Sequence, residues 1–273
     1  MDKKTFIACG LLAFAVSMQA QTKAGGIDKQ MMDKITAGSS STANRALANA
    51  IKTNAIDDLA RNFKKVGSFD THFSVETTKQ NIHNQKSSGR CWLFSGLNVL
   101  RSNFARNHKD TLRVELSHVY LSFHDQLEKA NLMLQGVIDN ANKPMDDPMV
   151  QFFFKSPIGD GGTFCGVADL VDKYGLVPME VMPESYSAEN TSRMASIVSS
   201  KLREYGLELR KMVANKKAAA AIKARKTEML GDIYHILTLA LGEPVKTFEY
   251  AFKDKNGNSV GKPKTYTPQT FRD

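Results

Sequence analysis

The segment NQKSSGRCWLFS, residues 84–95, constrains the fold of this chain more than any other stretch. Gly89 allows the backbone to turn tightly just before Cys91. The pattern predicts a turn followed by a helix that begins at Cys91. At a helix N-terminus, unpaired backbone N–H groups and the positive end of the dipole stabilise a thiolate, the nucleophilic form of cysteine. The helix is predicted from apolar residues at helical spacing, which are Trp92, Leu93, Phe94, Leu97, Leu100 and Phe104.

Gln85 stands six residues before Cys91 and carries an amide N–H donor. With the backbone N–H of Cys91, this donor is suited to hold the oxyanion that develops when a thiolate attacks a carbonyl carbon. Both residues belong to a Gln-x3-Gly-x-Cys-Trp-x-Phe-Ser pattern, which resembles the nucleophile segment of papain-like cysteine peptidases. The fuller run QKSSGRCWLF is similar to their bleomycin hydrolase and aminopeptidase C branch.

The cysteine content fits the same branch. Secreted papain-like enzymes often join a Cys three residues before the nucleophile to a Cys two residues before a glycine pair. Ser88 and Gly159 occupy those two places here, so both halves of that disulfide are missing. No Cys or His residues stand at metal-ligand spacing, and the sequence predicts neither a metal nor a cofactor.

A second motif lies in the run IGDGGTFCGVADLVDKYGLVP, which contains Gly161 and Gly162. Adjacent glycines let a substrate backbone approach the protein backbone closely. A helix over residues 163–174 is predicted to follow, ended by Gly175. The resemblance implies that the glycine pair forms the floor of the substrate cleft and acts as a backbone clamp. Cys165 is predicted to be a small buried side chain, and Asp160 a turn or cap residue.

The first twenty residues have the pattern of a secretory signal peptide. Lys3 and Lys4 precede an apolar segment over residues 6–16, and cleavage is expected near Ala20. The protein is therefore predicted to be exported, periplasmic or secreted. Loss of Lys3, Lys4 and Asp2 would lower the formal net charge of +9 by one. No later apolar run is long enough for a membrane span.

The expected organisation after the signal is an arm, helix and strand over residues 21–80, a helical lobe over 81–186, and a helical insertion with a hairpin over 187–273. Within the first part, a helix is predicted over residues 42–65, stopped by Gly67, and a strand over 68–76. The fold class is α+β, mainly the helical lobe of the papain-like fold. The resemblance implies that the β-rich lobe lies largely beyond residue 273.

Further elements are predicted from spacing and turn residues. Residues 101–109 are expected to form a basic exposed turn, and residues 116–134 a helix capped by Ser117. Two or three helices are expected over residues 187–241, with breaks at Gly206 and Gly231, and a hairpin over residues 248–267. Cationic residues in this part are interleaved with glutamates, which favours a solvated helical face over nucleic-acid binding.

A cysteine peptidase also needs an imidazole as general base and acid. His235 lies in an apolar helical run and is interpreted as structural. His118 and His124 are interpreted as packing or surface residues, and His72 and His83, which precede the nucleophile, as surface or strand residues. The resemblance implies that the catalytic His and Asn lie beyond residue 273, that the whole protein is a cysteine aminopeptidase acting on peptide substrates, and that it forms a homo-oligomer, a hexamer. The alternative is a non-catalytic half that binds a peptide or a partner.

Overall fold

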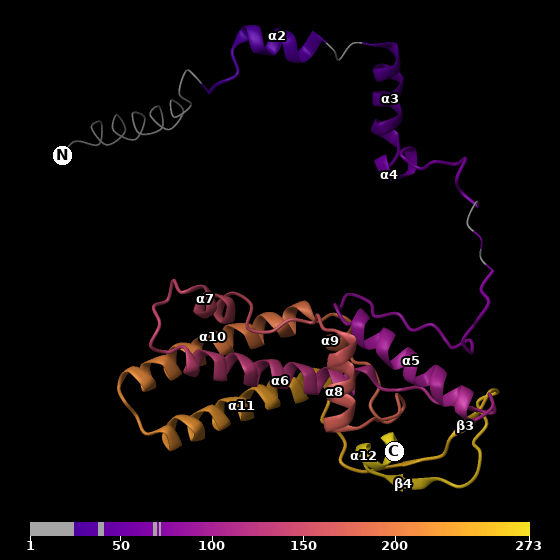
Figure 1. The fold of residues 1–273 in the computed structure, drawn as a ribbon, viewed down its shortest axis with the longest axis vertical. Helices are drawn as coiled ribbons and strands as arrows, with labels where there is room; N and C mark the ends of the chain where they lie inside the picture. Colours follow the sequence, from indigo (N-terminus) through magenta and orange to yellow (C-terminus); the bar gives the residue numbers. More distant parts are fainter. Residues whose placement is uncertain (1–24, 38–40, 68–69, 71) are drawn as a thin grey trace, which may run out of the picture. The chain divides into compact units, whose positions relative to one another are not determined.

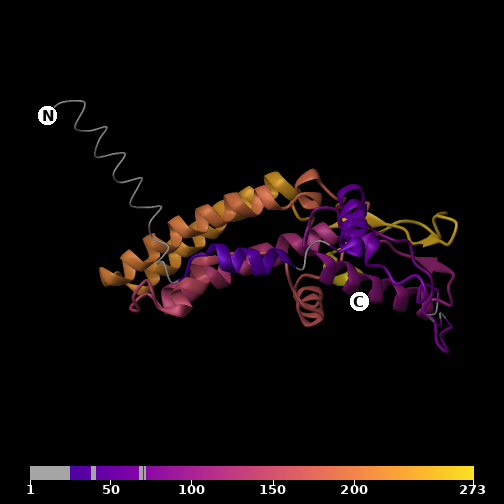
Figure 2. The same ribbon diagram turned by 90° about the horizontal axis from the view of Figure 1, so that it is seen from above.

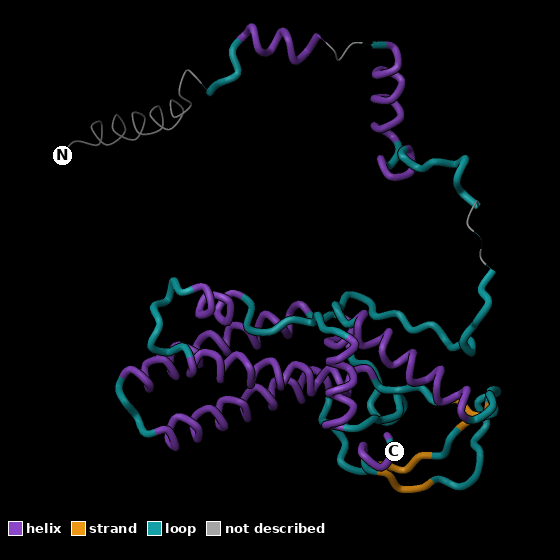
Figure 3. The backbone as a smooth tube through the Cα atoms, viewed as in Figure 1, coloured by secondary structure: helices purple, strands orange, loops and turns teal. Residues whose placement is uncertain are grey.

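The computed structural model describes residues 25–37, 41–67, 70 and 72–273, and the chain divides into two compact units, Met1–Ser74 and Val75–Asp273. The export signal predicted over residues 1–20 lies outside the described residues. The first unit contains α2 (Lys29–Ala37), α3 (Thr42–Thr53) and α4 (Ile56–Leu59), drawn as helices in Figure 3. Among its described residues, these helices bury no side chain.

Two predictions for this region were wrong. The single helix expected over residues 42–65 is divided at Asn54, whose backbone is extended, and it ends at Leu59. The strand expected over residues 68–76 does not form at its described residues, where Phe73 is 64% and Val75 is 84% exposed. In the described chain no strand pairs with this segment, so the alternating side chains have no surface to pack on and the pattern alone does not hold a strand.

The second unit is built around three helices that lie side by side, α6 (His118–Asp139), α10 (Ser192–Ala214) and α11 (Ala219–Leu241) (Figures 1 and 2). Their facing sides carry apolar residues three or four positions apart, the spacing that places side chains on one helix face. Removing this surface from water is the main favourable contribution to the packing. The buried residues include Phe123, Leu134, Val198, Leu202, Leu209, Ile233 and Leu237.

The predicted nucleophile helix is α5 (Cys91–Asn107), and it packs against α8 (Phe164–Tyr174) and α6. A Cβ atom at Gly96 would lie 2.7 Å from Val167, so a glycine is required for this close approach of α5 and α8. The N-cap predicted at Ser117 and the helix end predicted at Gly175 are confirmed, whereas α6 continues to Asp139, beyond the predicted end at residue 134. Ser117 accepts a hydrogen bond from the Tyr120 N–H, Thr163 caps α8, and Gly175 ends it with a φ of 78°.

Four short strands form two antiparallel pairs. β1 (Leu112–Arg113) pairs with β3 (Lys253–Asp254), and β2 (Phe248–Tyr250) pairs with β4 (Lys264–Tyr266). The hairpin predicted over residues 248–267 is thus present between β2 and β4, while its middle strand pairs elsewhere. The remaining helices of this unit are α7 (Pro148–Lys155), α9 (Tyr186–Glu189) and α12 (Pro268–Arg272).

The breaks predicted at Gly206 and Gly231 were wrong, because both glycines lie inside continuous helices. The chain turns instead between Ala214 and Ala219. A Cβ at Gly206 would lie 2.9 Å from Phe154, so this glycine admits a neighbouring ring. A helix-interior glycine costs only about 1 kcal/mol relative to alanine, which packing along a 23-residue helix can offset.

The exposed basic turn predicted over residues 101–109 was also wrong. Helix α5 continues to Asn107, and Arg101 is only 1% exposed. Its guanidinium forms an ion pair with Glu115 at 2.5 Å and donates a hydrogen bond to Asn98 at 2.8 Å. Glu115, from outside the helix, and Asn98, one turn earlier in it, therefore allow a charged residue to be buried where its sequence neighbours indicate a surface.

The described second unit is helix-rich with few strands, as expected for the helical part of the fold. The division predicted at residue 187 stays a prediction; α10 and α11, which follow it, pack directly on α6. In the part of the chain that the structure describes, no helix combines the length and apolar character required to cross a bilayer.

Candidate active site

Cys91 is the first residue of α5, and its side chain is exposed. The first helical hydrogen bonds run from the N–H groups of Leu93 and Phe94 to the carbonyl of Arg90, each at 3.0 Å. Among the described residues, the N–H groups of Cys91 and Trp92 have no hydrogen-bond partner. These two donors, together with the helix dipole, favour negative charge beside the thiol.

Gln85 lies in the loop before α5 and is half-buried. Its amide donates to the Ser88 carbonyl at 2.5 Å, and the Ser88 hydroxyl donates back to the Gln85 carbonyl at 2.7 Å. Lys86 between them has a φ of 54°, in the left-handed region that tightens the turn. One amide hydrogen of Gln85 is thus used inside the loop, and in the described chain the second has no partner. The oxyanion role of Gln85 stays a prediction.

Arg90 anchors the same loop to Glu184, a role that could not be predicted from its sequence neighbours. Although it directly precedes the exposed Cys91, Arg90 is 2% exposed. Its guanidinium forms two hydrogen bonds with Glu184, at 2.8 and 3.3 Å, and a third with the Ser88 hydroxyl at 3.1 Å. A planar guanidinium is suited to this forked pairing with a carboxylate. The thiol is therefore carried on an anchored loop.

The glycine loop over residues 159–162 lies against the start of α5. Asp160 makes the connection: its carboxylate accepts the backbone N–H of Gly89 at 2.9 Å, and its carbonyl accepts the Trp92 indole N–H at 2.6 Å. The Thr191 hydroxyl also bonds to the Asp160 carboxylate. The structure thus brings the two predicted motifs together. Asp160 is more than the turn residue that the sequence indicates.

The two glycines of the predicted clamp differ in their surroundings. The Gly161 carbonyl accepts a hydrogen bond from Lys129 at 2.7 Å, and a Cβ at Gly161 would meet nothing within 4 Å. At Gly162 a Cβ would lie 2.5 Å from the indole of Trp92. In the described chain, neither the N–H nor the carbonyl of Gly162 has a hydrogen-bond partner. The backbone N–H and carbonyl of Gly162, called the peptide edge below, are therefore free to bind another backbone.

Hydrogen bonds link no histidine to the Cys91 thiol within the described residues. His118 is buried and stacks on Phe94 with ring centroids 3.7 Å apart, and burial lowers the pKa of His118 to about 3. His124 stacks on Tyr174 at 3.9 Å. His118 and His124 are packing residues, as predicted, and His235 is exposed on α11.

The prediction for Cys165 was wrong. It was expected to be a buried apolar residue, but it is exposed on the first turn of α8, next to Phe164, which is itself exposed. The buried face of α8 starts two residues later, with Val167. The helix itself was predicted correctly, but Cys165 was wrongly assigned to its buried face.

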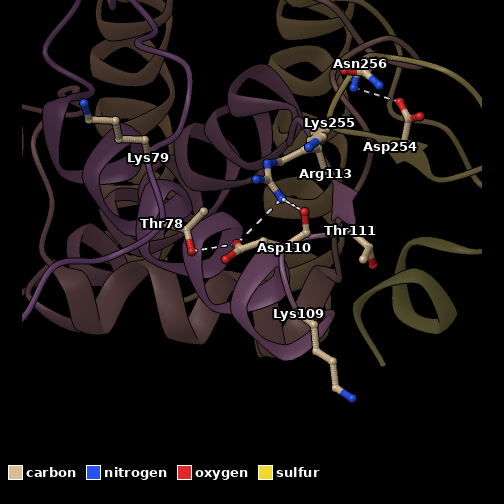
Figure 4. Close-up of a pocket in the computed structure, with 9 residues that line it drawn as sticks. All are labelled: Thr78, Lys79, Lys109, Asp110, Thr111, Arg113, Asp254, Lys255 and Asn256. Atoms are coloured by element: carbon tan, nitrogen blue, oxygen red, sulfur yellow. Dashed lines mark hydrogen bonds and ion pairs between the residues drawn. The ribbon is translucent and has the colours of Figure 1, made fainter.

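A separate cavity of about 710 Å³ lies between the end of α5, β1 and the turn after β3 (Figure 4). Its two carboxylates are already held, since Asp110 accepts from Thr78 at 2.8 Å and Asp254 accepts the Asn256 N–H at 2.8 Å. The predicted site residues do not line it. Across the described chain, His, Cys, Asp and Glu side chains do not gather in groups that would hold a metal.

Known proteins match most of this chain. A family model described as the Peptidase C1-like family matches residues 26–273. Aminopeptidase C of Lactobacillus delbrueckii subsp. lactis is 38% identical over 224 residues, which cover 82% of this chain and 49% of that protein. Bleomycin hydrolase of Homo sapiens is 39% identical over 184 residues, which cover 66% of this chain and 40% of that protein.

A solved structure leads to the same family. The crystal structure of PepW from Lactobacillus rhamnosis has a TM-score of 0.83 and 34% identity, covering 91% of this chain and 55% of that chain. The chain spans about half the length of the curated relatives it matches. The resemblance inferred from residues 85–95 is confirmed, and the chain belongs to the Peptidase C1-like family of papain-like cysteine peptidases.

Proposed function

We propose that this chain carries the nucleophile of a cysteine peptidase of the aminopeptidase C and bleomycin hydrolase type. One observation carries the proposal: Asp160 accepts hydrogen bonds from both Gly89 and Trp92, the residues on either side of the Arg90–Cys91 pair. These bonds fix the glycine loop beside the start of α5. A nucleophile beside a free peptide edge is the arrangement that cleavage of an extended peptide requires.

In the proposed reaction, the Cys91 thiolate attacks the carbonyl carbon of the substrate and forms a tetrahedral intermediate. The backbone N–H of Cys91 and the second amide hydrogen of Gln85 hold its oxyanion, since both donors are without partners in the described chain. Collapse of the intermediate breaks the C–N bond and leaves a thioester on Cys91. The departing amine takes a proton from an imidazole, and water then hydrolyses the thioester.

Substrate binding is assigned to the glycine pair. The free N–H and carbonyl of Gly162 pair with the backbone of an extended peptide, in the manner of an added strand. Gly161 supports this edge through the bond from its own carbonyl to Lys129. The pairing is independent of side chains, which suits an enzyme that accepts many sequences.

The general base is proposed to come from sequence beyond residue 273, as a histidine oriented by an asparagine. Two facts support this: hydrogen bonds link no described histidine to the Cys91 thiol, and the chain spans about half the length of its curated relatives. The 273-residue chain alone is therefore expected to react slowly with electrophiles and to show no turnover.

A peptidyl epoxide, which alkylates activated thiolates, tests the function in the full-length product of the gene. Mass spectrometry should find the adduct on Cys91 at neutral pH, and the C91S variant should lose it. C165S is the matched control, because Cys165 is also an exposed free thiol. Labelling that persists in C91S and disappears in C165S would refute the assignment of the nucleophile.

A non-catalytic half-domain that binds peptide is the second candidate, favoured by the absence of a histidine bonded to Cys91 in the described chain. Calorimetry with an unreactive peptide distinguishes the two. If the full-length product binds the peptide but neither hydrolyses it nor reacts with the epoxide, the binding function is correct.

Three further properties are proposed from the family resemblance and the N-terminal pattern. The whole protein removes N-terminal residues from peptides, forms a homo-oligomer, and is exported after cleavage near Ala20. Light scattering on the full-length product checks the oligomer. The intact mass of the secreted or periplasmic protein checks the cleavage, and a mass that still includes residues 1–20 would contradict it.

A further inference from the structure

Lys129 on α6 makes three short contacts with its side-chain nitrogen. The Nζ atom lies 2.6 Å from the Asp125 carboxylate, 2.7 Å from the Gly159 carbonyl and 2.7 Å from the Gly161 carbonyl. An ammonium group has three N–H donors, so these acceptors use all of them. Lys129 thus holds the backbone at both ends of the tripeptide that precedes Gly162.

The side chains of Gln126 and Asp125 stabilise this arrangement of Lys129 and the glycine loop. The Gln126 amide donates to the Gly159 carbonyl and to the Asp125 carboxylate, each at 3.1 Å. Asp125 is 9% exposed; burial raises the pKa of its carboxyl group, and the Lys129 ammonium opposes that shift. Because a buried carboxylate needs a partner, Asp125 in turn fixes the position of Lys129.

All three carbonyl groups of residues 159–161 consequently accept a hydrogen bond from a side chain of α5 or α6. Lys129 donates hydrogen bonds to the carbonyls of Gly159 and Gly161, and the Trp92 indole N–H donates to the carbonyl of Asp160 at 2.6 Å. The Lys129 ammonium also lies over the Trp92 ring, 5.5 Å from its centroid. Gly162 is the first residue of this loop whose backbone groups have no partner in the described chain.

We propose that Lys129 is a positioning residue for peptide binding: it fixes the carbonyl groups of Gly159 and Gly161 against α6, so that the N–H and carbonyl of Gly162 stay free for a substrate backbone. The inference rests on the proposed function. It adds that peptide recognition depends on a cation that does not itself touch the substrate.

Loss of the ammonium leaves the carbonyls of Gly159 and Gly161 and the buried Asp125 carboxylate without a charged partner. The carbonyl groups of the loop are then expected to rotate toward water, which displaces the N–H and carbonyl of Gly162. The thiol is held separately by Arg90 and Glu184, so its intrinsic reactivity does not depend on Lys129. We therefore expect recognition of a peptide to suffer and alkylation by a small reagent to persist.

The test compares two electrophiles in the full-length product of the gene. A peptidyl epoxide reports peptide recognition together with thiol reactivity, and iodoacetamide reports thiol reactivity alone. In K129M the rate constant of adduct formation on Cys91 should fall about tenfold or more for the epoxide, the scale of one or two lost charge-assisted hydrogen bonds. The rate for iodoacetamide should change less than about twofold, and K129R should recover much of the epoxide rate because its guanidinium also donates to several oxygens.

K173M is the matched control. Lys173 forms an ion pair with Glu128, also on α6, but it is exposed and bonds to no residue of the glycine loop. K173M should keep both rates. Equal epoxide rates in K129M and K173M would overturn the role of Lys129, and so would a parallel fall of both rates in K129M with an intact fold.

Circular dichroism first establishes that each variant is folded. If K129M does not fold, D125N decides, because it keeps the ammonium but removes its anchoring carboxylate; a D125N epoxide rate equal to that of the unmodified protein would overturn the proposal. A full-length protein whose Cys91 reacts with neither electrophile contradicts the proposed function and the inference together. A protein that reacts normally with the epoxide but is insensitive to Lys129 contradicts the inference alone.

Discussion

The Asp160 carboxylate accepts a hydrogen bond from the backbone N–H of Gly89 at 2.9 Å, across 71 positions of sequence. Gly89 lies two residues before Cys91, and Asp160 lies two residues before Gly162. A Cβ at Gly89 would lie 2.8 Å from the Asp160 Cβ, so the Asp160 side chain occupies the space that a side chain at position 89 would need. The relative placement of nucleophile and peptide edge therefore depends on this contact.

The first prediction concerns that carboxylate. D160A removes the acceptor of both the Gly89 N–H and the Thr191 hydroxyl. Thr191 is buried, so an unpartnered hydroxyl there costs about 1–3 kcal/mol, whereas water can replace the acceptor of the exposed Gly89 N–H. Urea denaturation of the chain should therefore show a loss of about 1–3 kcal/mol. The control is D169A, an exposed aspartate on α8, for which we expect a change within about 0.5 kcal/mol. Equal effects of the two substitutions would contradict the structural role of Asp160.

The second prediction compares the neighbouring glycines. G162A places a methyl group 2.5 Å from the Trp92 indole, whereas G161A meets no atom within 4 Å. Overpacking of this kind costs about 1–3 kcal/mol, and we expect that loss only for G162A. The fluorescence of Trp92, the one tryptophan of the chain, should also change only in G162A. A larger destabilisation by G161A would show that the loop lies differently.

Several local features could be predicted from the sequence because their causes lie within a few residues. Cys91 begins a helix, Ser117 acts as an N-cap, and Gly175 ends α8, all as expected. At Ser117 a side-chain oxygen, and at Gly175 a glycine, satisfies the backbone groups at the helix end, so these signals lie within the segment itself. At Cys91 the signal is the apolar spacing of the residues that follow it.

Features set by distant partners could not be predicted. Arg90 and Arg101 are buried because carboxylates from elsewhere in the chain, Glu184 and Glu115, neutralise them. The role of Lys129 likewise depends on carbonyl groups 30 and 32 residues away. A single sequence does not show which distant residues will pair in the fold. Without a known partner, a charged residue is predicted to lie on the surface. The same limit explains why residues 101–109 were expected to be an exposed turn.

The third prediction tests one of these buried pairs. R101M leaves Glu115 without its nearest cation and removes donors from the carbonyls of Asn81 and Val114. Breaking a fully buried pair from one side costs about 3–5 kcal/mol, and because the Glu115 side chain is 33% exposed we expect a smaller loss for R101M, about 2–3 kcal/mol in urea denaturation. R106M, in the exposed last turn of the same helix, should change the free energy of unfolding by less than about 0.5 kcal/mol.

A double substitution separates the charge from the packing in that pair. R101M/E115Q also removes the stranded carboxylate and should regain part of the lost stability. If R101M/E115Q is no more stable than R101M, the cost comes from lost packing of the arginine side chain instead of an unpaired charge.

The last prediction is a pH effect from His124. Its ring nitrogens are buried without hydrogen-bond partners in the described chain, and the ring stacks on Tyr174. Burial is the largest cause that lowers the pKa of His124 to about 4; the charge of Lys173 adds to the shift and that of Glu128 opposes it. The unfolded chain has the ordinary value of about 6.5. Above pH 6.5 the histidine is neutral in both states and does not affect the pH dependence.

As the pH falls from 6.5 towards 4, the unfolded state binds a proton that the folded state does not, so the free energy of unfolding decreases by about 1.4 kcal/mol per pH unit. H124F keeps a flat ring against Tyr174 and removes this titration. Between pH 7 and pH 5, H124F should therefore lose about 2 kcal/mol less than the unmodified chain in urea denaturation. His118 is present in both proteins, so its contribution cancels. H235Q, at an exposed position on α11, should retain the full acid sensitivity; equal sensitivity in H124F would mean that the His124 ring is charged in the folded protein.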